Sequence, residues 1–197
     1  MQKTQKGNII FLNGVSSAGK TTLAKALQER LDEPFYIINS DMFTSSASLM
    51  MPGKFKTRDN AGFNVFCKTL SGMHHVIKLY SDLGMNTIVD HVLVNDFNGK
   101  NPKLLEECVD LLHEYPVLFI HVSCPINELR RREKERGDRD IGQAEHFLQY
   151  LVPKDTYDLT IDTYNETQDE CKERIIAALG HPDKFTAFKT LWSQRAK

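Results

Sequence analysis

The sequence predicts an α/β fold in which a parallel sheet of about five strands lies between helices in a three-layer sandwich. Two observations predict it. Short apolar runs rich in β-branched residues recur along the 197-residue chain. Between these runs lie segments that carry apolar side chains at helical spacing. This alternation is typical of parallel sheets covered by helices. The runs that we interpret as buried strands are 8–12, 35–38, 86–89, 117–122 and 157–161.

The helices are predicted from apolar side chains that recur three and four residues apart. The clearest is the segment 63–80, which carries Phe63, Phe66, Leu70, Met73, Ile77 and Tyr80 on one face and is followed by Gly84. The tail 181–197 carries Phe185, Phe188, Leu191 and Trp192, which favours a last helix packed on the body. Other predicted helices are 21–31, 102–114, 126–136 and 167–179.

Composition and charge limit the classes of function. With 41% hydrophobic residues the chain can bury one substantial core, so we expect a single domain over 1–197. The net charge of −1 provides no broad field for nucleic acid or an anionic membrane. The four cysteines form no Cys-x-x-Cys pair, and we expect neither disulfides nor a zinc site. No apolar stretch near the N-terminus is long enough for a signal or membrane segment, so we expect a cytoplasmic protein.

A glycine-rich segment between the first predicted strand and the first predicted helix is the strongest motif. Residues 14–21 read Gly-Val-Ser-Ser-Ala-Gly-Lys-Thr and fit G-x-x-x-x-G-K-[ST], the phosphate-binding P-loop pattern. Glycines let successive N–H groups point at phosphate oxygens, and the helix N-terminus adds positive partial charge. The alternative is a glycine-rich turn that only begins a helix. The nucleotide-binding residues that we expect here are Gly14, Ser16, Ser17, Ala18, Gly19, Lys20, Thr21 and Thr22.

Four side chains would carry the chemistry around the bound phosphates. Lys20 would bridge the β- and γ-phosphates, and the Thr21 hydroxyl would ligate Mg²⁺. Asp41 follows the second strand, where ligands bind in open α/β sheets, and would act as general base towards an attacking hydroxyl. Asp90 ends the third strand as a Walker-B carboxylate that would hold Mg²⁺. The alternatives are a capping residue for Asp41 and an ordinary strand-end residue for Asp90.

An arginine-rich segment predicts a mobile lid over about 130–142. Arg132 and Arg136 lie on one helix face, and Arg139 follows a Gly turn. Guanidinium groups that close on a triphosphate neutralise charge on the transferring phosphoryl group. The alternative is a solvated charged helix with local ion pairs. A second long segment without a clear pattern, about 44–60, is interpreted as the loop that receives the acceptor.

The sequence resembles the chloramphenicol phosphotransferase-like family of P-loop kinases through most of its length. The resemblance implies a kinase-type P-loop sheet, ATP as donor, Asp41 as catalytic base and Lys20 with Thr21 as phosphate and magnesium residues. It also implies lid roles for Arg132, Arg136 and Arg139, among which we assign Arg136 to catalysis. The matching pieces are 9–14, 16–20, Asp41, 51–52, 88–93, 132–139, 157–158 and 161–163.

The chain departs from the family pattern around the expected acceptor. The segment 44–60 keeps Met51 and Pro52 but otherwise differs, and Val152 stands where the pattern has a histidine. These departures argue against chloramphenicol itself as the acceptor. Fold and cofactor carry over better than specificity.

The resulting hypothesis is an ATP- and Mg²⁺-dependent O-phosphotransferase that acts on a hydroxyl group of a small molecule. Two rival hypotheses are a kinase of nucleic-acid 5′-hydroxyl groups, prompted by the basic lid, and a non-catalytic nucleotide sensor that switches a partner through lid closure. The near-neutral net charge argues against the first rival, and Asp41 with the loop after it argues against the second. The apolar tail near Trp192 suggests a surface for a homodimer.

Overall fold

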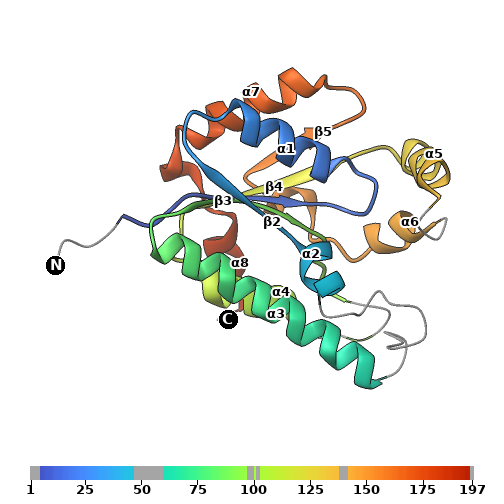
Figure 1. Cartoon of the computed structure of the whole chain (residues 1–197), viewed down its shortest axis with the longest axis horizontal. Coiled ribbons are helices and arrows are strands. Elements are labelled where there is room, and N and C mark those ends of the chain that lie inside the picture. The colour runs from blue at the N-terminus through green and yellow to red at the C-terminus, as the bar shows by residue number, and fades with distance from the viewer. Residues whose placement is uncertain (1–4, 47–59, 97–99, 101–102, 138–141, 196–197) are drawn as a thin grey trace.

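The sheet is fully parallel and has five strands, with helices on both faces (Figure 1). The computed structural model describes residues 5–46, 60–96, 100, 103–137 and 142–195. The strands lie in the order β2-β3-β1-β4-β5, so the predicted α/β fold is confirmed. Their bounds are Ile9–Asn13 for β1, Phe35–Asn39 for β2, Asn86–His91 for β3, Val117–Ser123 for β4 and Leu159–Asp162 for β5.

Helices fill the connections between the strands. The long helix α3 ends before Gly84, whose φ of +78° suits a residue without a side chain. The helix α7 begins with a capping box between Thr167 and Glu170. The bounds are Lys20–Arg30 for α1, Ser40–Ser46 for α2, Asn60–Asp82 for α3, Leu104–Leu112 for α4, Ile126–Arg136 for α5, Gln143–Leu148 for α6, Gln168–Leu179 for α7 and Ala187–Arg195 for α8, with short 3-10 turns at Lys154–Thr156 and Pro182–Lys184.

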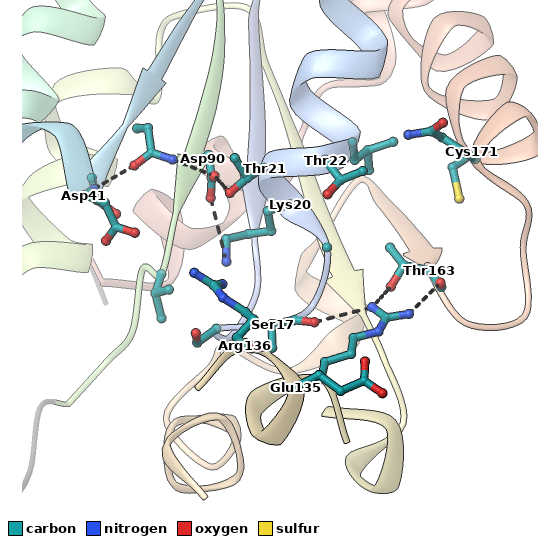
Figure 2. Close-up of a pocket in the computed structure, with 18 of the residues that line it drawn as sticks. Ser17, Lys20, Thr21, Thr22, Asp41, Asp90, Glu135, Arg136, Thr163 and Cys171 are labelled. Carbon is teal, nitrogen blue, oxygen red and sulfur yellow. Dashed lines mark hydrogen bonds and ion pairs between the residues drawn. The ribbon is translucent and has the colours of Figure 1, made fainter. Parts of the chain in front are cut away.

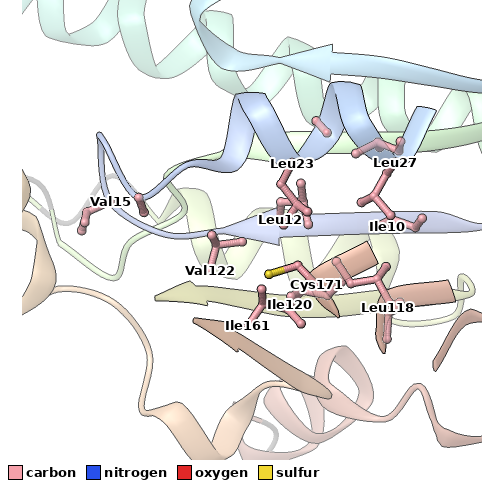
Figure 3. Close-up of a cluster of buried hydrophobic side chains, with 14 of the residues drawn as sticks. Ile10, Leu12, Val15, Leu23, Leu27, Leu118, Ile120, Val122, Ile161 and Cys171 are labelled. Carbon is pink, nitrogen blue, oxygen red and sulfur yellow. The ribbon is translucent and has the colours of Figure 1, made fainter. Parts of the chain in front are cut away.

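The central strand β1 is buried on both faces, and its side chains divide between two apolar clusters. Ile9 and Phe11 face α3, α4 and α8, whereas Ile10 and Leu12 face α1 and α7. Each fully buried side chain of this kind contributes about 1.5–3 kcal/mol to stability. Figure 3 shows the second cluster, which joins Ile10, Leu12, Leu118, Ile120, Val122 and Ile161 of the sheet to Leu23 and Leu27 of α1 and Cys171 of α7.

Three features differ from the expectations. Helices α2 and α6 were not predicted, because each has only six or seven residues and too few apolar positions for a period. The predicted strand 157–161 is wrong at its start, since β5 begins at Leu159. Tyr157 instead packs on Phe119 at a ring distance of 4.4 Å, and the Asp158 carboxylate accepts the Phe119 N–H. The predicted helix 102–114 is shorter, because Lys103 takes a left-handed φ of 58° just before α4.

The C-terminal helix α8 packs on the body as predicted. Phe188 is buried and meets Phe11 and Phe119 at ring distances of 5.7 and 5.0 Å. Trp192 is 42% exposed and stacks on His113 at 4.4 Å, so it covers α4. The homodimer stays a prediction. No helix among the described residues has the length and apolar character needed to cross a membrane.

Candidate functional site

A cavity of about 530 Å³ opens at the carboxyl edge of the sheet (Figure 2). Binding sites in open α/β sheets lie at this edge. Its walls come from the loop after β1, the starts of α1, α2 and α7, the ends of β2 and β3, the helix α5, and the segments after β3 and β5. The lining residues are Ser16, Ser17, Gly19, Lys20, Thr21, Thr22, Leu23, Asn39, Ser40, Asp41, Asp90, Val92, Arg132, Glu135, Arg136, Thr163, Glu166, Gln168 and Cys171.

The segment 14–19 turns sharply between β1 and α1. A side chain at Gly14 would put a Cβ atom 2.4 Å from the carbonyl oxygen of Val122, so only glycine fits there. Gly19 has a φ of +92° and Ser17 a φ of 62°, both in the left-handed region. For a residue such as Ser17 this conformation costs about 1–2 kcal/mol. The turn therefore depends on the surrounding structure to hold it.

Two serine hydroxyls of this turn are buried without a partner. Ser16 and Ser17 both line the cavity, and no described group forms a hydrogen bond with either Oγ atom. A buried hydroxyl without a partner costs free energy, and a bound oxyanion would relieve that cost. These hydroxyls therefore mark a polar pocket suited to an anion, next to the start of α1.

Lys20 is buried beside the same pocket. Its side chain is 7% exposed, its Nζ donates to the Val15 carbonyl at 2.9 Å, and it lies 3.7 Å from Asp90 Oδ1. Lysine is rarely buried without compensating contacts of this kind. The ammonium group is thus held at the floor of the cavity, where phosphates would be expected.

Asp90 is the centre of a hydrogen-bond network that joins the strands β2 and β3 to α1. Its Oδ2 accepts from Thr21 Oγ1 at 2.6 Å and from Asn39 Nδ2 at 2.8 Å. Thr21 and Asp90 thus supply a hydroxyl and a carboxylate oxygen in direct contact, which are hard ligands of the type that Mg²⁺ prefers beside phosphates. The donor set fits the expected magnesium ion, and the metal roles of both residues stay a prediction.

Asp41 lies in the first turn of α2 and lines the cavity on the side away from Thr163 (Figure 2). Its N–H donates to Asn39 Oδ1 at 2.7 Å, so Asn39 supplies the capping contact at this helix start. Asp41 is an exposed residue and lines the same cavity as Lys20 and Asp90.

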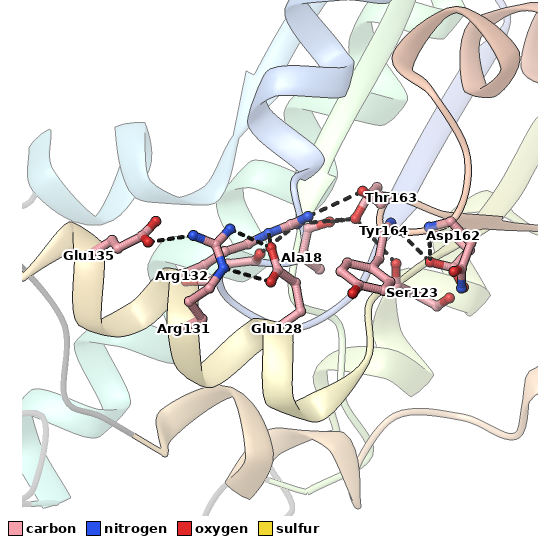
Figure 4. Close-up of polar contacts among 11 residues, drawn as sticks. Ala18, Ser123, Glu128, Arg131, Arg132, Glu135, Asp162, Thr163 and Tyr164 are labelled. Atoms are coloured by element: carbon pink, nitrogen blue, oxygen red, sulfur yellow. Dashed lines mark hydrogen bonds and ion pairs between the residues drawn. The ribbon is translucent and has the colours of Figure 1, made fainter.

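The predicted lid arginines differ in their surroundings. Arg132 donates from Nε to Glu128 at 2.8 Å, from Nη1 to the Ser17 carbonyl at 3.4 Å, and from Nη2 to the Thr163 carbonyl at 3.1 Å (Figure 4). Arg136 lines the cavity from the last turn of α5. Arg139 lies outside the described residues, as does 47–59 of the expected acceptor loop.

Helix α5, which belongs to the predicted lid segment, is fixed to α6 by a buried carboxylate. Glu133 is 1% exposed and accepts the N–H groups of Gly142 at 2.8 Å and Ala144 at 2.7 Å. On the exposed side of the same helix, Arg130 donates to Glu145 at 2.6 Å. The two ends of the lid segment are therefore joined to each other.

Several polar residues of the site were not identified from the sequence, and two of them, Asn39 and Thr163, connect separate elements. Asn39 joins Asp90 to the start of α2, and Thr163 donates from Oγ1 to the Ala18 carbonyl at 2.8 Å. Asn39 is the last residue of β2 and Thr163 comes directly after β5, positions that could have identified both residues. Their partners lie 51 and 145 residues away, so the contacts themselves are visible only in the fold.

The cavity also extends along the start of α7. Thr22, Thr163, Glu166, Gln168 and Cys171 line it there. Burial raises the pKa of the Cys171 thiol to about 11, so this sulfur is neutral at physiological pH. Gln168 and Cys171 are thus uncharged, and Glu166 forms an ion pair with Arg174.

Comparison with known proteins gives the family. The model of the chloramphenicol phosphotransferase-like proteins matches residues 7–180. An adenylyl-sulfate kinase of Clostridium acetobutylicum is 24% identical over 186 residues, covering 89% of this chain and 84% of that protein. A Mycobacterium tuberculosis protein to which O-phosphotransferase activity has been ascribed is 30% identical over 177 residues, covering 80% of this chain and 76% of that protein.

A solved structure shares the fold. The Mycobacterium tuberculosis APS kinase CysC, determined in complex with AMPPNP and APS, superposes with a TM-score of 0.62 at 17% identity, covering 89% of this chain and 98% of the other. This likeness shows that the two chains share a fold. The match over 7–180 shows that the chain belongs to the chloramphenicol phosphotransferase-like family of P-loop phosphotransferases.

Proposed function

We propose that the chain is an ATP- and Mg²⁺-dependent O-phosphotransferase that transfers a phosphoryl group to a hydroxyl of a small molecule. The observation that carries the proposal is that one cavity holds both the buried Lys20 ammonium and the hydroxyls of Ser16 and Ser17, which have no hydrogen-bond partner among the described residues. A cation and free donors beside a helix N-terminus favour a phosphate chain.

The two ends of ATP would occupy different parts of the cavity. The γ-phosphate would lie by Lys20 and Asp90, because the Lys20 ammonium is there, and the nucleoside would lie by the uncharged side chains of Gln168 and Cys171. Backbone amides of 14–19 with Lys20 would hold the β- and γ-phosphates. The Michaelis complex is thus oriented by the walls before any group closes over it.

Thr21 and Asp90 would hold the magnesium ion. When bound, Mg²⁺ neutralises charge on the β- and γ-phosphate oxygens. The Thr21 hydroxyl now donates to Asp90, so it would turn its oxygen towards the metal on binding. Asn39 would keep Asp90 in place during that change, since it contacts the same Oδ2 atom.

Asp41 would act as the general base. The acceptor hydroxyl gives its proton to the Asp41 carboxylate while its oxygen bonds to the γ-phosphorus, and the bond from that phosphorus to the β,γ-bridging oxygen breaks to release ADP. General-base assistance of this kind contributes about 10²- to 10⁴-fold. Arg136, on the wall opposite the sheet, would stabilise the charge on the transferring group together with Lys20.

A small acceptor fits the dimensions of the cavity. A volume of about 530 Å³ lies within the range of small-molecule sites, and the nucleotide takes part of it. The related adenylyl-sulfate kinase of Clostridium acetobutylicum is named for a small-molecule acceptor as well. We therefore infer an acceptor of metabolite or antibiotic size.

The test is phosphoryl transfer from γ-labelled ATP to a panel of alcohols, sugars, nucleosides, antibiotics and 5′-hydroxyl oligonucleotides. We expect transfer to a member of the small-molecule set, lost with Asp41→Asn and with Lys20→Ala. Transfer that survives both variants would remove the assigned mechanism. Binding of ATP without transfer to any acceptor would favour the nucleotide sensor, and transfer to oligonucleotides alone would favour the 5′-hydroxyl kinase.

A further inference from the structure

Two carbonyl groups of the phosphate-binding turn are held from outside the turn. The Ser17 carbonyl accepts from Arg132 Nη1 at 3.4 Å, and the Ala18 carbonyl accepts from Thr163 Oγ1 at 2.8 Å. These contacts come from α5 and from the segment after β5, which are separate elements. Carbonyls that are held from outside the turn cannot rotate towards a bound anion, and an anion-binding nest needs N–H groups rather than carbonyls to face its ligand.

The two outside residues also bind each other. Arg132 Nη1 donates to Thr163 Oγ1 at 3.2 Å, and Nη2 donates to the Thr163 carbonyl at 3.1 Å (Figure 4). A hydroxyl has one proton and two acceptor lone pairs. Thr163 can therefore accept from Arg132 and donate to Ala18 at the same time, which gives a directed chain of hydrogen bonds from α5 to the turn.

Both residues are themselves anchored. Glu128 accepts from Arg132 Nε at 2.8 Å, and the Ser123 carbonyl accepts the Thr163 N–H at 3.1 Å. A Cβ atom added to Gly19 would lie 3.4 Å from the Thr163 side chain, so the threonine packs closely on the turn. These contacts therefore fix the turn relative to β4 and α5.

We propose that Arg132 and Thr163 form a clasp that holds the strained turn at Ser17 in the conformation that receives phosphate. Arg132 is then a positioning residue that acts through the turn, whereas Arg136 would contact the phosphates themselves. The left-handed φ of 62° at Ser17 is the strain that the clasp offsets. This inference rests on the proposed function, because it assumes that the turn binds phosphate groups.

The guanidinium group of Arg132 already forms hydrogen bonds within the protein. Its three nitrogen atoms donate to Glu128, Ser17 and Thr163. Arg132 is therefore a fixed part of the cavity wall, not a side chain at the open end of α5. A planar guanidinium can bridge several fixed acceptors at once, and a lysine ammonium cannot reproduce that geometry. Arginine and lysine at this position should therefore differ, although both are positive.

The experiment measures the affinity of Mg²⁺-pyrophosphate by calorimetry, because this probe occupies the phosphate turn without base or ribose. Thr163→Val removes the hydroxyl at nearly constant volume, and Thr163→Ser restores it. Arg132→Lys keeps the charge, and Arg132→Gln removes it. Arg131→Gln is the matched control, since Arg131 lies on the same helix, is 56% exposed and pairs with Glu128 and Glu135. Melting temperatures identify variants that fail to fold.

We expect Thr163→Val, Arg132→Lys and Arg132→Gln each to weaken pyrophosphate binding by about 3- to 10-fold, the loss that one or two hydrogen bonds produce. Thr163→Ser and Arg131→Gln should stay within about twofold of the wild type. The double variant Arg132→Gln/Thr163→Val should lose little more than either single variant, because both remove the same clasp.

Two results would overturn the clasp. One is wild-type affinity in Thr163→Val; the other is wild-type affinity in Arg132→Lys combined with a loss in Arg132→Gln, which indicates direct contact of the charge with phosphate. If Thr163→Val does not fold, Arg132→Lys decides the question. A folded wild type that binds neither pyrophosphate nor ATP would remove the proposed function itself, whereas a binding wild type with unaffected variants would remove the clasp alone.

Discussion

The Asn39 side chain connects Asp41 with Asp90. Its Nδ2 donates to Asp90 Oδ2 at 2.8 Å, while its Oδ1 accepts the N–H of Asp41 at 2.7 Å. One amide group thus sets the distance between the proposed base and the proposed metal ligand. It also caps α2, the helix that presents Asp41 to the cavity.

We predict that Asn39→Asp destabilises the protein by about 1–3 kcal/mol at neutral pH, because it replaces the donor to Asp90 with a second carboxylate oxygen. The capping oxygen is retained, so the loss reports the contact with Asp90. Mg²⁺ should recover part of the stability, since a cation between two carboxylates lowers their repulsion. Chemical denaturation with and without Mg²⁺ measures both effects.

Asn165→Asp is the matched control for that change. Asn165 Nδ2 donates to Asp162 Oδ2 at 2.8 Å, the same pairing in an exposed turn. Solvent screens the new charge there, and we expect a change within about 0.5 kcal/mol and no response to Mg²⁺. Equal losses in the two variants would contradict a special role for Asn39.

Thr21→Val should separate metal binding from nucleotide binding. The variant keeps the shape of the side chain but removes the hydroxyl that donates to Asp90 at 2.6 Å. We predict that the affinity for Mg²⁺·ATP falls about tenfold or more, whereas the affinity for metal-free ATP changes less than about threefold. Titrations with and without chelator test it, with Thr69→Val as a control for threonine removal from an exposed helix face. Equal losses for both forms of ATP would argue against Thr21 as a metal ligand.

The buried carboxylate of Glu133 should contribute more to stability than the exposed carboxylate of Glu145, although both join α5 to α6. Glu133→Gln leaves one of the N–H groups of Gly142 and Ala144 facing an NH₂ group, and we expect a loss of about 1–3 kcal/mol. Glu145→Gln removes the exposed pair with Arg130, which also joins α5 to α6, and should cost less than about 1 kcal/mol. Urea denaturation compares them, and a smaller loss for Glu133→Gln than for Glu145→Gln would contradict this.

The sequence predicts the parts of the site that local patterns carry. The glycine spacing and the lysine of 14–21 predict a phosphate-binding turn, and the position of Asp90 at the end of a buried strand predicts its place in the site. The contacts of Asn39 and Thr163 were not predictable, because each depends on strands brought together by the order β2-β3-β1-β4-β5. Arg132 illustrates the limit. Its residue type indicated a phosphate contact, and only the fold reveals the carbonyl groups that it binds.

Buried histidines predict a loss of stability in acid. Burial lowers the pKa of His74 to about 3 and that of His121 to about 4, below the ordinary value of about 6.5. The unfolded chain therefore binds more protons than the folded chain, so both contributions are complete above about pH 6.5 and are lost as the pH falls below it. Each histidine should add a slope of about 1.4 kcal/mol per pH unit once the unfolded form is protonated.

Denaturation between pH 7.5 and pH 4.5 measures this slope. His74→Leu should reduce the slope by about 1.4 kcal/mol per pH unit, the contribution of one proton, because it removes one buried imidazole. His75→Gln is the control, since His75 lies next in the chain with its side chain 60% exposed. An unchanged slope in His74→Leu, or an equal reduction in His75→Gln, would contradict the assignment.

The most direct test of the phosphate site is calorimetry of Mg²⁺·AMPPNP binding to the folded wild type and to Lys20→Ala. We predict saturable binding of one nucleotide per chain, weakened about 10- to 100-fold in the variant, because a buried charge-assisted contact with the phosphates is lost. A folded wild type that takes up no nucleotide, or a Lys20→Ala variant with unchanged affinity, would contradict the proposal that residues 14–21 bind the phosphates of ATP.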